Sequence, residues 1–421
     1  MVDTIIPPAR TTRRVSTSPV TDRAAALAVR AVARNLRGGT LVLREAGVDH
    51  RFGAGDPVAT VTIHDRRAYR ALVGSGSVGL AQSYVDGWWD CDSPTALVQL
   101  LIRNLGHAMR VADRAGRLTG RVSAPLRRVR PADRVADRRN VRAHYDLGNE
   151  FFELMLDETM AYSCAVFDGP DVSLREASTA KLDRVCRKLG LGPNDHVVEI
   201  GTGWGSFAVY AASTFGCEVT TTTVSDAQYT YATKRVAEAG LARQVTVLDQ
   251  DYRDLEGTYD KLVSIEMIEA VGWQQLDTFL STCSHLLRDD GLMALQTIVV
   301  ADQSYERAKH HQDFIKRLIF PGGCLHSVEA VARSAARATD LRIVDLEDIG
   351  CHYAETLRRW RANLRAHGPE VAALDLGERF QRLWDFYLCY CEAAFAERHV
   401  TDVQIVLAKR AWRGALVTRP A

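Results

Sequence analysis

The fold is decided by one stretch of the sequence, Val197-Val198-Glu199-Ile200-Gly201-Thr202-Gly203-Trp204-Gly205. Its apolar start has the length and composition of a buried strand, and a G-x-G-x-G turn follows directly. Glycines let a backbone approach a ligand closely, and ligands of doubly wound sheets bind beyond the carboxyl ends of the strands. The stretch therefore predicts a ligand site where this strand ends, with an ordinary strand-to-helix turn as the alternative interpretation.

Strands and helices alternate regularly after this turn. The alternation indicates an α/β fold with a doubly wound parallel sheet and helices on both faces. The predicted strands are 196–200, 218–223, 244–249, 259–265, 291–300, 341–346 and 401–408, and the predicted helices are 226–239, 276–287, 305–318, 328–336 and 354–398.

The acidic residue before the glycines narrows the class of ligand. The spacing of the turn differs from the G-x-G-x-x-G fingerprint of pyrophosphate-binding turns. A carboxylate at Glu199 suits a ligand with an ammonium group, which S-adenosylmethionine has and NAD lacks. At the next strand end Thr223 and Gln228 offer polar contacts, although Ser225 is explained equally well as the N-cap of the following helix. Residues 249–254 end the third strand, where an adenine would lie, unless they form a polar surface turn.

The 421 residues divide by composition into four segments. We expect a disordered tail at 1–22, an α+β domain at 23–105, an Arg-rich linker at 106–142 and the α/β domain at 143–421. The net charge is only +1, but 11 Arg and 3 Asp lie between Arg110 and Arg142. This basic block is either a docking surface for phospholipid headgroups or a solvated linker.

Composition also bears on the compartment. The nine cysteines are scattered without C-x-x-C spacing, so we expect no metal site, no disulfide framework and a reducing compartment. No signal peptide and no apolar stretch of membrane-spanning length are evident. We therefore expect a cytoplasmic protein that visits the inner face of the membrane transiently if its substrate is a membrane lipid.

Several further motifs carry a resemblance to a known family. They run in family order over residues 141–409 and are Val141-Arg142-Ala143-His144-Tyr145-Asp146-Leu147-Gly148-Asn149, Tyr162-Ser163-Cys164-Ala165-Val166-Phe167, Ser264-Ile265-Glu266-Met267-Ile268-Glu269-Ala270-Val271-Gly272, Phe320-Pro321-Gly322-Gly323 and His352-Tyr353-Ala354-Glu355-Thr356-Leu357-Arg358-Arg359-Trp360. Residues 79–89 match the N-terminal domain of the same family. With these motifs and the glycine turn, the chain resembles the cyclopropane fatty acid synthase family of S-adenosylmethionine methyltransferases.

The resemblance implies a Rossmann-like class I methyltransferase sheet with helical additions that bind the acyl chain. It implies transfer of a one-carbon unit from S-adenosylmethionine to the cis double bond of an unsaturated phospholipid acyl chain, which gives a cyclopropane. The candidate cofactor-binding residues are Tyr162, Ser163, Glu199, Gly201, Gly203, Gly205, Thr223, Gln228, Tyr252 and Ile265. The candidate catalytic residues are Cys164, Glu269, Gln296 and Tyr353, and in the family Cys164, Glu269 and Tyr353 help to hold a bicarbonate ion.

Each catalytic candidate also has a simpler explanation. Glu269 alone is explained as a solvent-facing carboxylate at a helix start, Tyr353 as a packing residue, and Cys164 as a small buried apolar side chain. Gln296 stands where the family usually has His, and a neutral amide binds an anion without taking up a proton. Glu266 is an extra acid where some members have Gly.

These departures leave the product open. The pattern around Gln296 also resembles relatives that make a mid-chain methylene branch on an acyl chain, which a separate reductase would then reduce. A non-catalytic lipid-binding protein on the same fold is the alternative of another class. A homodimer is left open, and no nucleic-acid partner is expected.

Overall fold

The computed structural model describes residues 19–119 and 148–414, with the side chains of 107–119 left out. Most of the predicted tail, residues 120–142 of the predicted linker and the motif residues 141–147 lie outside the described part. The contacts divide the chain into two units. The larger comprises residues 131–311, 320–371 and 400–421, and the smaller comprises 1–130, 312–319 and 372–399.

The larger unit is built on a seven-stranded sheet with the order β10-β11-β9-β8-β5-β6-β7. Its strands are β5 (His196–Ile200), β6 (Glu218–Thr223), β7 (Val245–Asp249), β8 (Tyr259–Ile265), β9 (Leu287–Val300), β10 (Arg342–Asp348) and β11 (Val400–Ala408). Strands β5 to β9 pair in parallel, whereas β11 is antiparallel to both of its neighbours. The predicted α/β class is therefore confirmed, and each predicted strand is present.

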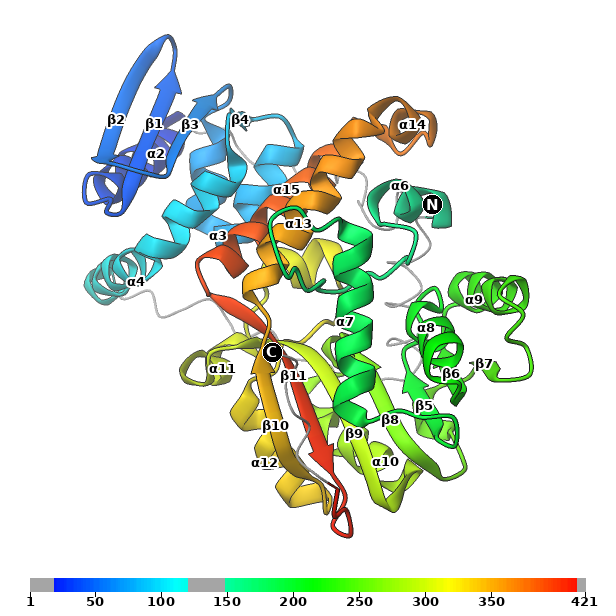
Figure 1. The fold of residues 1–421 in the computed structure, drawn as a ribbon. Helices are drawn as coiled ribbons and strands as arrows, with labels where there is room; N and C mark the ends of the chain where they lie inside the picture. The colour runs from blue at the N-terminus through cyan, green and yellow to red at the C-terminus, as the bar shows by residue number, and fades with distance from the viewer. Residues whose placement is uncertain (1–18, 120–147, 415–421) are drawn as a thin grey trace. The chain divides into compact units, whose positions relative to one another are not determined.

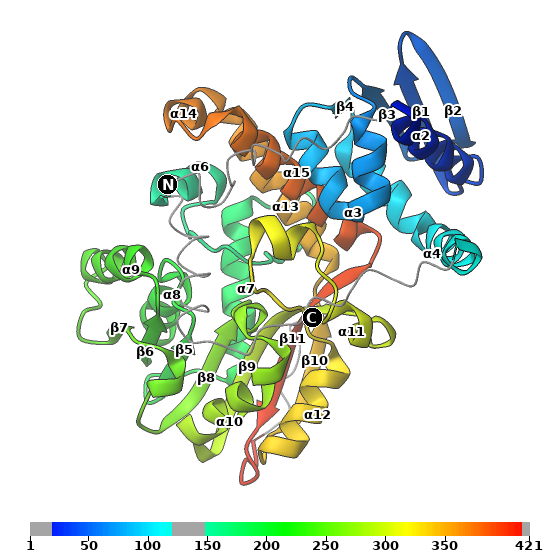
Figure 2. The same ribbon diagram turned by 180° about the vertical axis from the view of Figure 1, so that it is seen from behind.

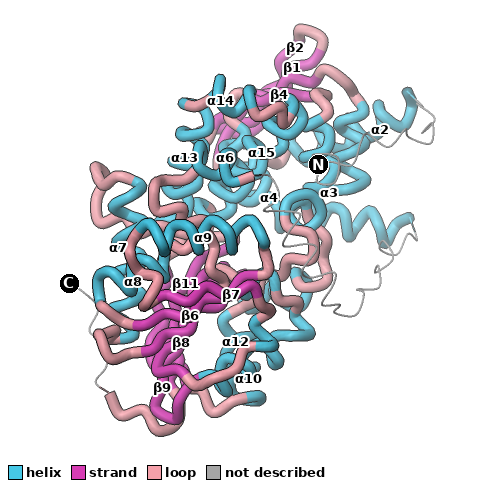
Figure 3. The backbone as a smooth tube through the Cα atoms, turned by 90° about the vertical axis from the view of Figure 1, so that its right-hand side faces the viewer, coloured by secondary structure: helices cyan, strands magenta, loops and turns pink. Residues whose placement is uncertain are grey.

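Helices cover both faces of this sheet, as the opposite views in Figures 1 and 2 and the end-on view in Figure 3 show. One face packs on α7 (Leu174–Leu189), α8 (Ser206–Phe215) and α9 (Asp226–Glu238), and the other packs on α10 (Leu276–Leu286), α11 (Asp302–Ala308) and α12 (Val328–Ala338). Successive strand residues point to opposite faces, so Val197 joins the core under α7 and Val198 the core over α10. Because both faces of the sheet are buried, β9 and β11 contain continuous apolar runs, residues 292–295 and 405–408, without an alternating polar pattern.

Three helices beyond the sheet replace the single helical stretch predicted at 354–398. They are α13 (Cys351–Ala366), α14 (Gly368–Ala373) and α15 (Gly377–Ala396), and α6 (Asn149–Met155) precedes the sheet. Pro369 cannot continue the hydrogen bonds of α13, and Gly377 takes a φ of +75°, which glycine tolerates best. The predicted helix at 305–318 is likewise wrong in its middle, because α11 ends at Ala308 and a π-helical turn, Ile315–Ile319, follows.

The smaller unit has a four-stranded sheet with the order β2-β1-β3-β4. Its elements are α2 (Pro19–Ala33), β1 (Gly39–Glu45), β2 (Val48–Ala54), β3 (Val58–Ile63), α3 (Arg67–Val85), β4 (Trp89–Cys91), α4 (Pro94–Thr119) and α15. The sequence interpretation missed β2 and β4. Trp89 is 2% exposed and donates its indole N–H to Ser83 Oγ at 2.9 Å, so this tryptophan packs in the core.

In the described part of the chain, no helix is long and apolar enough to cross a membrane.

Candidate active site

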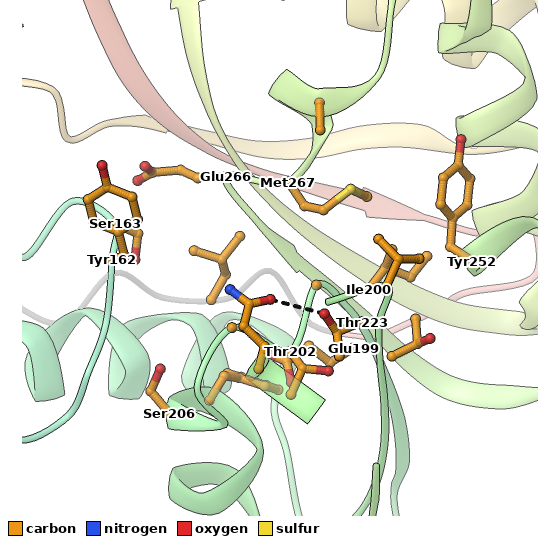
Figure 4. Close-up of a pocket in the computed structure, with 18 of the residues that line it drawn as sticks. Tyr162, Ser163, Glu199, Ile200, Thr202, Ser206, Thr223, Tyr252, Glu266 and Met267 are labelled. Carbon is orange, nitrogen blue, oxygen red and sulfur yellow. Dashed lines mark hydrogen bonds between the residues drawn. The ribbon is translucent and has the colours of Figure 1, made fainter. Parts of the chain in front are cut away.

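A pocket lies in the larger unit at the carboxyl ends of the strands, where a doubly wound sheet binds its ligand (Figure 4). Nine of the ten predicted cofactor-binding residues line it, namely Tyr162, Ser163, Glu199, Gly201, Gly203, Thr223, Gln228, Tyr252 and Ile265. Figure 4 shows Tyr162 and Ser163 on one side of this pocket and Tyr252 on the other. The sheet topology thus gathers segments that are up to 103 residues apart in the sequence.

The glycines of the turn serve two different purposes. Gly201 has a φ of +103°, and a Cβ there would lie 3.0 Å from Met267. Gly203 has a φ of +52°, and a Cβ there would meet no protein atom within 4 Å, because this residue faces the pocket. Gly205 is absent from the pocket lining and lies where its Cβ would come 3.3 Å from the Cβ of Ala232 in α9. The structure therefore places Gly205 at a helix contact, outside the pocket lining.

The carboxyl group of Glu199 is buried beside the turn. Its Oε2 atom accepts a hydrogen bond of 2.6 Å from Thr221 Oγ1. Burial raises the pKa of Glu199 to about 8, since a charged carboxylate loses hydration there. A ligand that brings a positive charge would favour the ionised carboxylate, so the chemistry of this wall fits the ammonium and sulfonium groups of S-adenosylmethionine.

The ends of β6 and β7 complete the pocket. Thr223 Oγ1 donates to Gln228 Oε1 at 3.0 Å, and Ser225 also caps α9 by accepting from the Gln228 N–H at 3.4 Å, so the two interpretations hold together. Residues 250–253 all line the pocket, and Asp251 pairs there with Arg253 at 2.6 Å. The segment after β7 is therefore more than a polar surface turn.

A cluster of polar side chains adjoins the pocket and is centred on Glu266, which we call the Glu266 cluster. Glu266 Oε1 accepts from the Cys164 backbone N–H at 2.7 Å and from Gln296 Nε2 at 2.9 Å. Glu266 Oε2 accepts from the Tyr353 hydroxyl at 2.5 Å. Three of the four predicted catalytic residues therefore converge on an acid that the sequence interpretation noted only as a departure from the family.

The fourth predicted catalytic residue, Glu269, lies beside this cluster. Its Oε1 atom accepts from the Ile298 backbone N–H at 2.6 Å and from Thr297 Oγ1 at 2.9 Å. Its Oε2 atom is buried and has no hydrogen-bond partner among the described residues. Burial and the neighbouring Glu266 raise the pKa of Glu269 to about 8. The buried carboxyl group does not match the alternative of a solvent-facing helix start.

Strand β11 adds two residues that sequence reasoning missed. Gln296 Nε2 donates to Asp402 Oδ2 at 2.8 Å, and Gln404 Nε2 donates to Gln296 Oε1 at 3.1 Å. Gln296 therefore bridges β11 and Glu266 through both ends of its amide. Burial, reinforced by the charges of Glu266 and Glu269, raises the pKa of Asp402 well above its usual range.

Two further buried groups set the charge balance. Lys181 in α7 donates from Nζ to Ser163 Oγ at 2.8 Å, and burial lowers its pKa while Glu266 opposes that shift. Sequence reasoning missed this residue as well. Burial raises the pKa of the Cys164 thiol well above its usual range, so the thiol stays protonated, and Cys164 contacts Glu266 through its backbone N–H.

The strand order and the pocket at the glycine turn define the class of protein, a class I methyltransferase whose cofactor is S-adenosylmethionine. A family model described as mycolic acid cyclopropane synthetase matches residues 132–405, and the chain belongs to this family. It is therefore an enzyme that modifies acyl chains of lipids.

Two curated relatives cover most of the chain. Tuberculostearic acid methyltransferase UfaA1 of Mycobacterium tuberculosis is 36% identical over 372 residues, which are 84% of each chain. Cyclopropane-fatty-acyl-phospholipid synthase of Escherichia coli K12 is 34% identical over 370 residues, which are 87% of this chain and 92% of the relative. Among solved structures, mycolic acid cyclopropane synthase CmaA1 in complex with SAH and CTAB is 32% identical, with a TM-score of 0.60 over 65% of this chain and 98% of that one.

Proposed function

We propose that the enzyme transfers a one-carbon unit from S-adenosylmethionine to the cis double bond of an unsaturated phospholipid acyl chain, and that the product is a cyclopropane acyl chain. The observation that carries this proposal is the Glu266 cluster at the wall of the cofactor pocket. Buried carboxylates beside a methyl-donor site suit a reaction that creates a positive charge on carbon and then removes a proton. The names of the two curated relatives support the choice of a lipid acceptor.

The residues that line the pocket would bind and orient the cofactor. S-adenosylmethionine, when bound, supplies a methyl group on a positively charged sulfur. Glu199 and Gly203 both line the pocket, where Glu199 would hold the cofactor's cationic end and Gly203 would leave room for a close approach of the backbone. An isolated alkene is a weak nucleophile, so the double bond must be held in line with that methyl group in a site without water.

Carboxylates and aromatic rings would stabilise the carbocation that methyl transfer creates on the acyl chain. Attack by the alkene leaves a carbocation on the adjacent carbon of the acyl chain, which negative charge and π-faces stabilise. Glu266 in the pocket wall supplies the charge, to which Glu269 beside it adds when ionised, and the ring of Tyr162 supplies aromatic surface. The ring of Trp360 packs against Tyr162 at a centroid distance of 5.2 Å. The carbocation becomes a neutral product only when it loses one proton, so the site also needs a base.

A methylene-branched product is the second candidate, and the neutral Gln296 favours it. Where the family usually has His, Gln296 offers no group that can take up a proton. Slower proton removal gives the cation time for a hydride shift, after which loss of a proton leaves a methylene branch. A relative whose name describes methyl transfer, and not ring formation, is consistent with this outcome. A separate flavin- or nicotinamide-dependent reductase would then act on the product.

The deciding experiment is the fatty-acid profile of a host that lacks cyclopropane lipids, measured by gas chromatography with mass spectrometry. Expression of the enzyme should produce a new ring-containing peak at the expense of oleate. A methylene-branched peak would replace the first candidate with the second. No new lipid, from a protein that still binds S-adenosylmethionine, would reject both. The Glu269→Gln variant serves as the control for background modification.

We further propose that the enzyme reaches its substrate at the inner face of the membrane, through the basic residues between Arg110 and Arg142. Basic residues near an anionic surface contribute about 1 kcal/mol each, and salt screens this attraction. The enzyme should therefore sediment with anionic vesicles at low salt and be released at high salt, and it should bind neutral vesicles less. Equal binding to both vesicle types would indicate that the basic block is a solvated linker.

A further inference from the structure

Two of the three groups that the family resemblance assigns to a bicarbonate ion, Cys164 and Tyr353, already hold a carboxylate of the chain. Cys164 donates its backbone N–H and Tyr353 its hydroxyl to the two oxygens of Glu266, and Gln296 adds a third donor. A carboxylate and a bicarbonate ion present the same pair of oxygens to such donors. In Figure 4 the carboxylate of Glu266 points toward Tyr162 and Ser163, at the wall of the pocket.

The backbone at Glu266 shows that this placement carries a cost. Glu266 has a φ of +49°, in the left-handed region that costs residues other than glycine about 1 kcal/mol or more. Its N–H donates to the Gln296 carbonyl oxygen at 2.8 Å, directly after β8, which fixes this conformation. Glycine would meet the backbone requirement without strain. The glutamate is therefore explained by what its carboxylate does among the three donors.

The charges around the cluster leave no favourable place for a second anion. Buried carboxyl groups of Glu269 and Asp402 flank Glu266, and each has one oxygen without a hydrogen-bond partner among the described residues. Burial raises the pKa of all three acids, and repulsion from Glu266 raises the pKa of Glu269 and Asp402 further. A bicarbonate ion added here would lose its hydration and would lie beside these acidic groups. The three donors that could bind it already donate to Glu266. The residues present therefore do not fit a bicarbonate ion.

We propose that Glu266 is the base of the reaction and that the enzyme works without bicarbonate. This inference rests on the proposed function, since it concerns the proton that must leave after methyl transfer. A C–H bond of the newly added methyl group breaks, and its electron pair forms the bond to the cationic carbon. The proton passes to Glu266, so the ring and the protonated carboxyl group are formed together. If a hydride shift comes first, the same electron pair forms the C=C bond of a methylene branch.

The test compares three proteins in buffers freed of carbon dioxide and in buffers with added bicarbonate. Wild type should transfer radiolabelled methyl groups from S-adenosylmethionine into vesicles of dioleoyl phospholipid at the same rate in both. Glu266→Gly, which suits the positive φ and empties the cradle, should lose at least about 100-fold in rate without bicarbonate and recover part of it when bicarbonate is added. Glu266→Gln keeps the cradle filled and should stay inactive in both buffers.

A binding measurement keeps the result separate from the choice of lipid. Carbon-13 NMR of labelled bicarbonate should show binding to Glu266→Gly and none to wild type, while calorimetry confirms that both still bind S-adenosylmethionine. Bicarbonate binding by wild type, or a wild-type rate that depends on it, would overturn the inference. Failure of Glu266→Gly to bind bicarbonate would show that the cradle is not an anion site. If wild type methylates no lipid, the proposed function fails, and the binding result still decides whether Glu266 replaces the anion.

Discussion

The cofactor half of the site and the Glu266 cluster are built in opposite ways. The cofactor half takes most of its wall from residues 199–253, where strand ends, glycines and a helix cap follow one another along the chain. The Glu266 cluster takes Cys164, Glu266, Gln296, Tyr353 and Asp402 from five separate segments. Local sequence therefore builds most of the cofactor pocket, whereas long-range topology assembles the Glu266 cluster.

The cofactor half and the Glu266 cluster also differ in the partners that surround their buried carboxyl groups. Glu199 accepts a hydrogen bond from Thr221, and its raised pKa shows that burial outweighs this partner. Glu266 has three donors and the nearby Lys181, all of which favour its charged form against burial. Glu199 is thus suited to gain its counter-charge from a ligand, while Glu266 has its partners within the chain. Substitutions at the two sites should separate binding from turnover.

The largest effect is expected for Glu269→Gln, which removes a titratable carboxyl group from beside the Glu266 cluster. Turnover should fall by about 100-fold or more, because the cation loses a neighbouring carboxylate. The affinity for S-adenosylmethionine, measured by calorimetry, should change less than twofold, since Glu269 is not among the pocket-lining residues. Wild-type turnover in this variant would remove Glu269 from the mechanism.

The pH dependence of turnover sharpens the same substitution. The pKa of Glu269 is about 8, so the carboxyl group is mostly protonated at pH 7 and ionises as the pH rises. Wild-type turnover should therefore increase through pH 8, and the difference from Glu269→Gln should be smallest at pH 6. The variant should lack this rise. An identical rise in both enzymes would assign the titration to another group.

Glu199→Gln should show the opposite pattern. The affinity for S-adenosylmethionine should fall roughly 10- to 100-fold, about 1.4 kcal/mol for each factor of ten, because a neutral amide no longer balances the ligand's charge. The folded pKa of Glu199 lies above the unfolded value, so ionisation opposes folding as the pH rises from about 4.5 to about 8. The variant should thus be more stable than wild type by roughly 1–3 kcal/mol at pH 7.

Chemical denaturation without ligand tests the stability term, and calorimetry tests the affinity. Glu218→Gln on the exposed first position of β6 is the matched control, since it removes one negative charge from the same sheet outside the pocket. The control should leave affinity unchanged. A stability loss in Glu199→Gln would show that the carboxylate is already paired in the free enzyme.

Tyr353→Phe should have a smaller effect within the Glu266 cluster. The substitution removes one of three donors to Glu266 and leaves the Cys164 N–H and Gln296 in place. We expect turnover to fall about tenfold, the value of one charge-assisted hydrogen bond of roughly 1.5 kcal/mol, with unchanged affinity for S-adenosylmethionine. A loss equal to that of Glu266→Gly would show that the donors act as a single unit.

The same contrast explains what the sequence could and could not predict. The alternation of strands and helices and the glycine turn are local patterns, so they led to the α/β sheet and to the residues at the pocket. Asp402 and Gln404 were missed because their partner, Gln296, is more than 100 residues away. A signal was present, since Asp402 and Gln404, two residues apart, share one face of a strand that is apolar at every position from 403 to 408 except Gln404.

Lys181 was missed for a related reason. A lysine in a helix is usually solvated, and only the run of apolar positions around it in α7, including Leu182 and Val185, places it on the buried face. The sequence showed Glu266 only as a departure from the family, because the three donors that bind its carboxylate come from distant segments and meet only in the folded chain. The roles predicted for all these residues depend on the variants described here.

The smallest effects separate two glycines of one turn, Gly203→Ala and Gly205→Ala. Both residues have positive φ, so each alanine costs about 1 kcal/mol, more at Gly205 where φ is +84° and the new Cβ lies 3.3 Å from Ala232. Gly205→Ala should therefore lower the melting temperature more and leave cofactor affinity within twofold of wild type. Gly203→Ala projects its methyl group into the pocket and should weaken cofactor binding several-fold with the smaller loss of stability. If both variants weaken binding equally, the turn responds as one rigid unit, and the separation between cofactor contact and helix packing within it would be wrong.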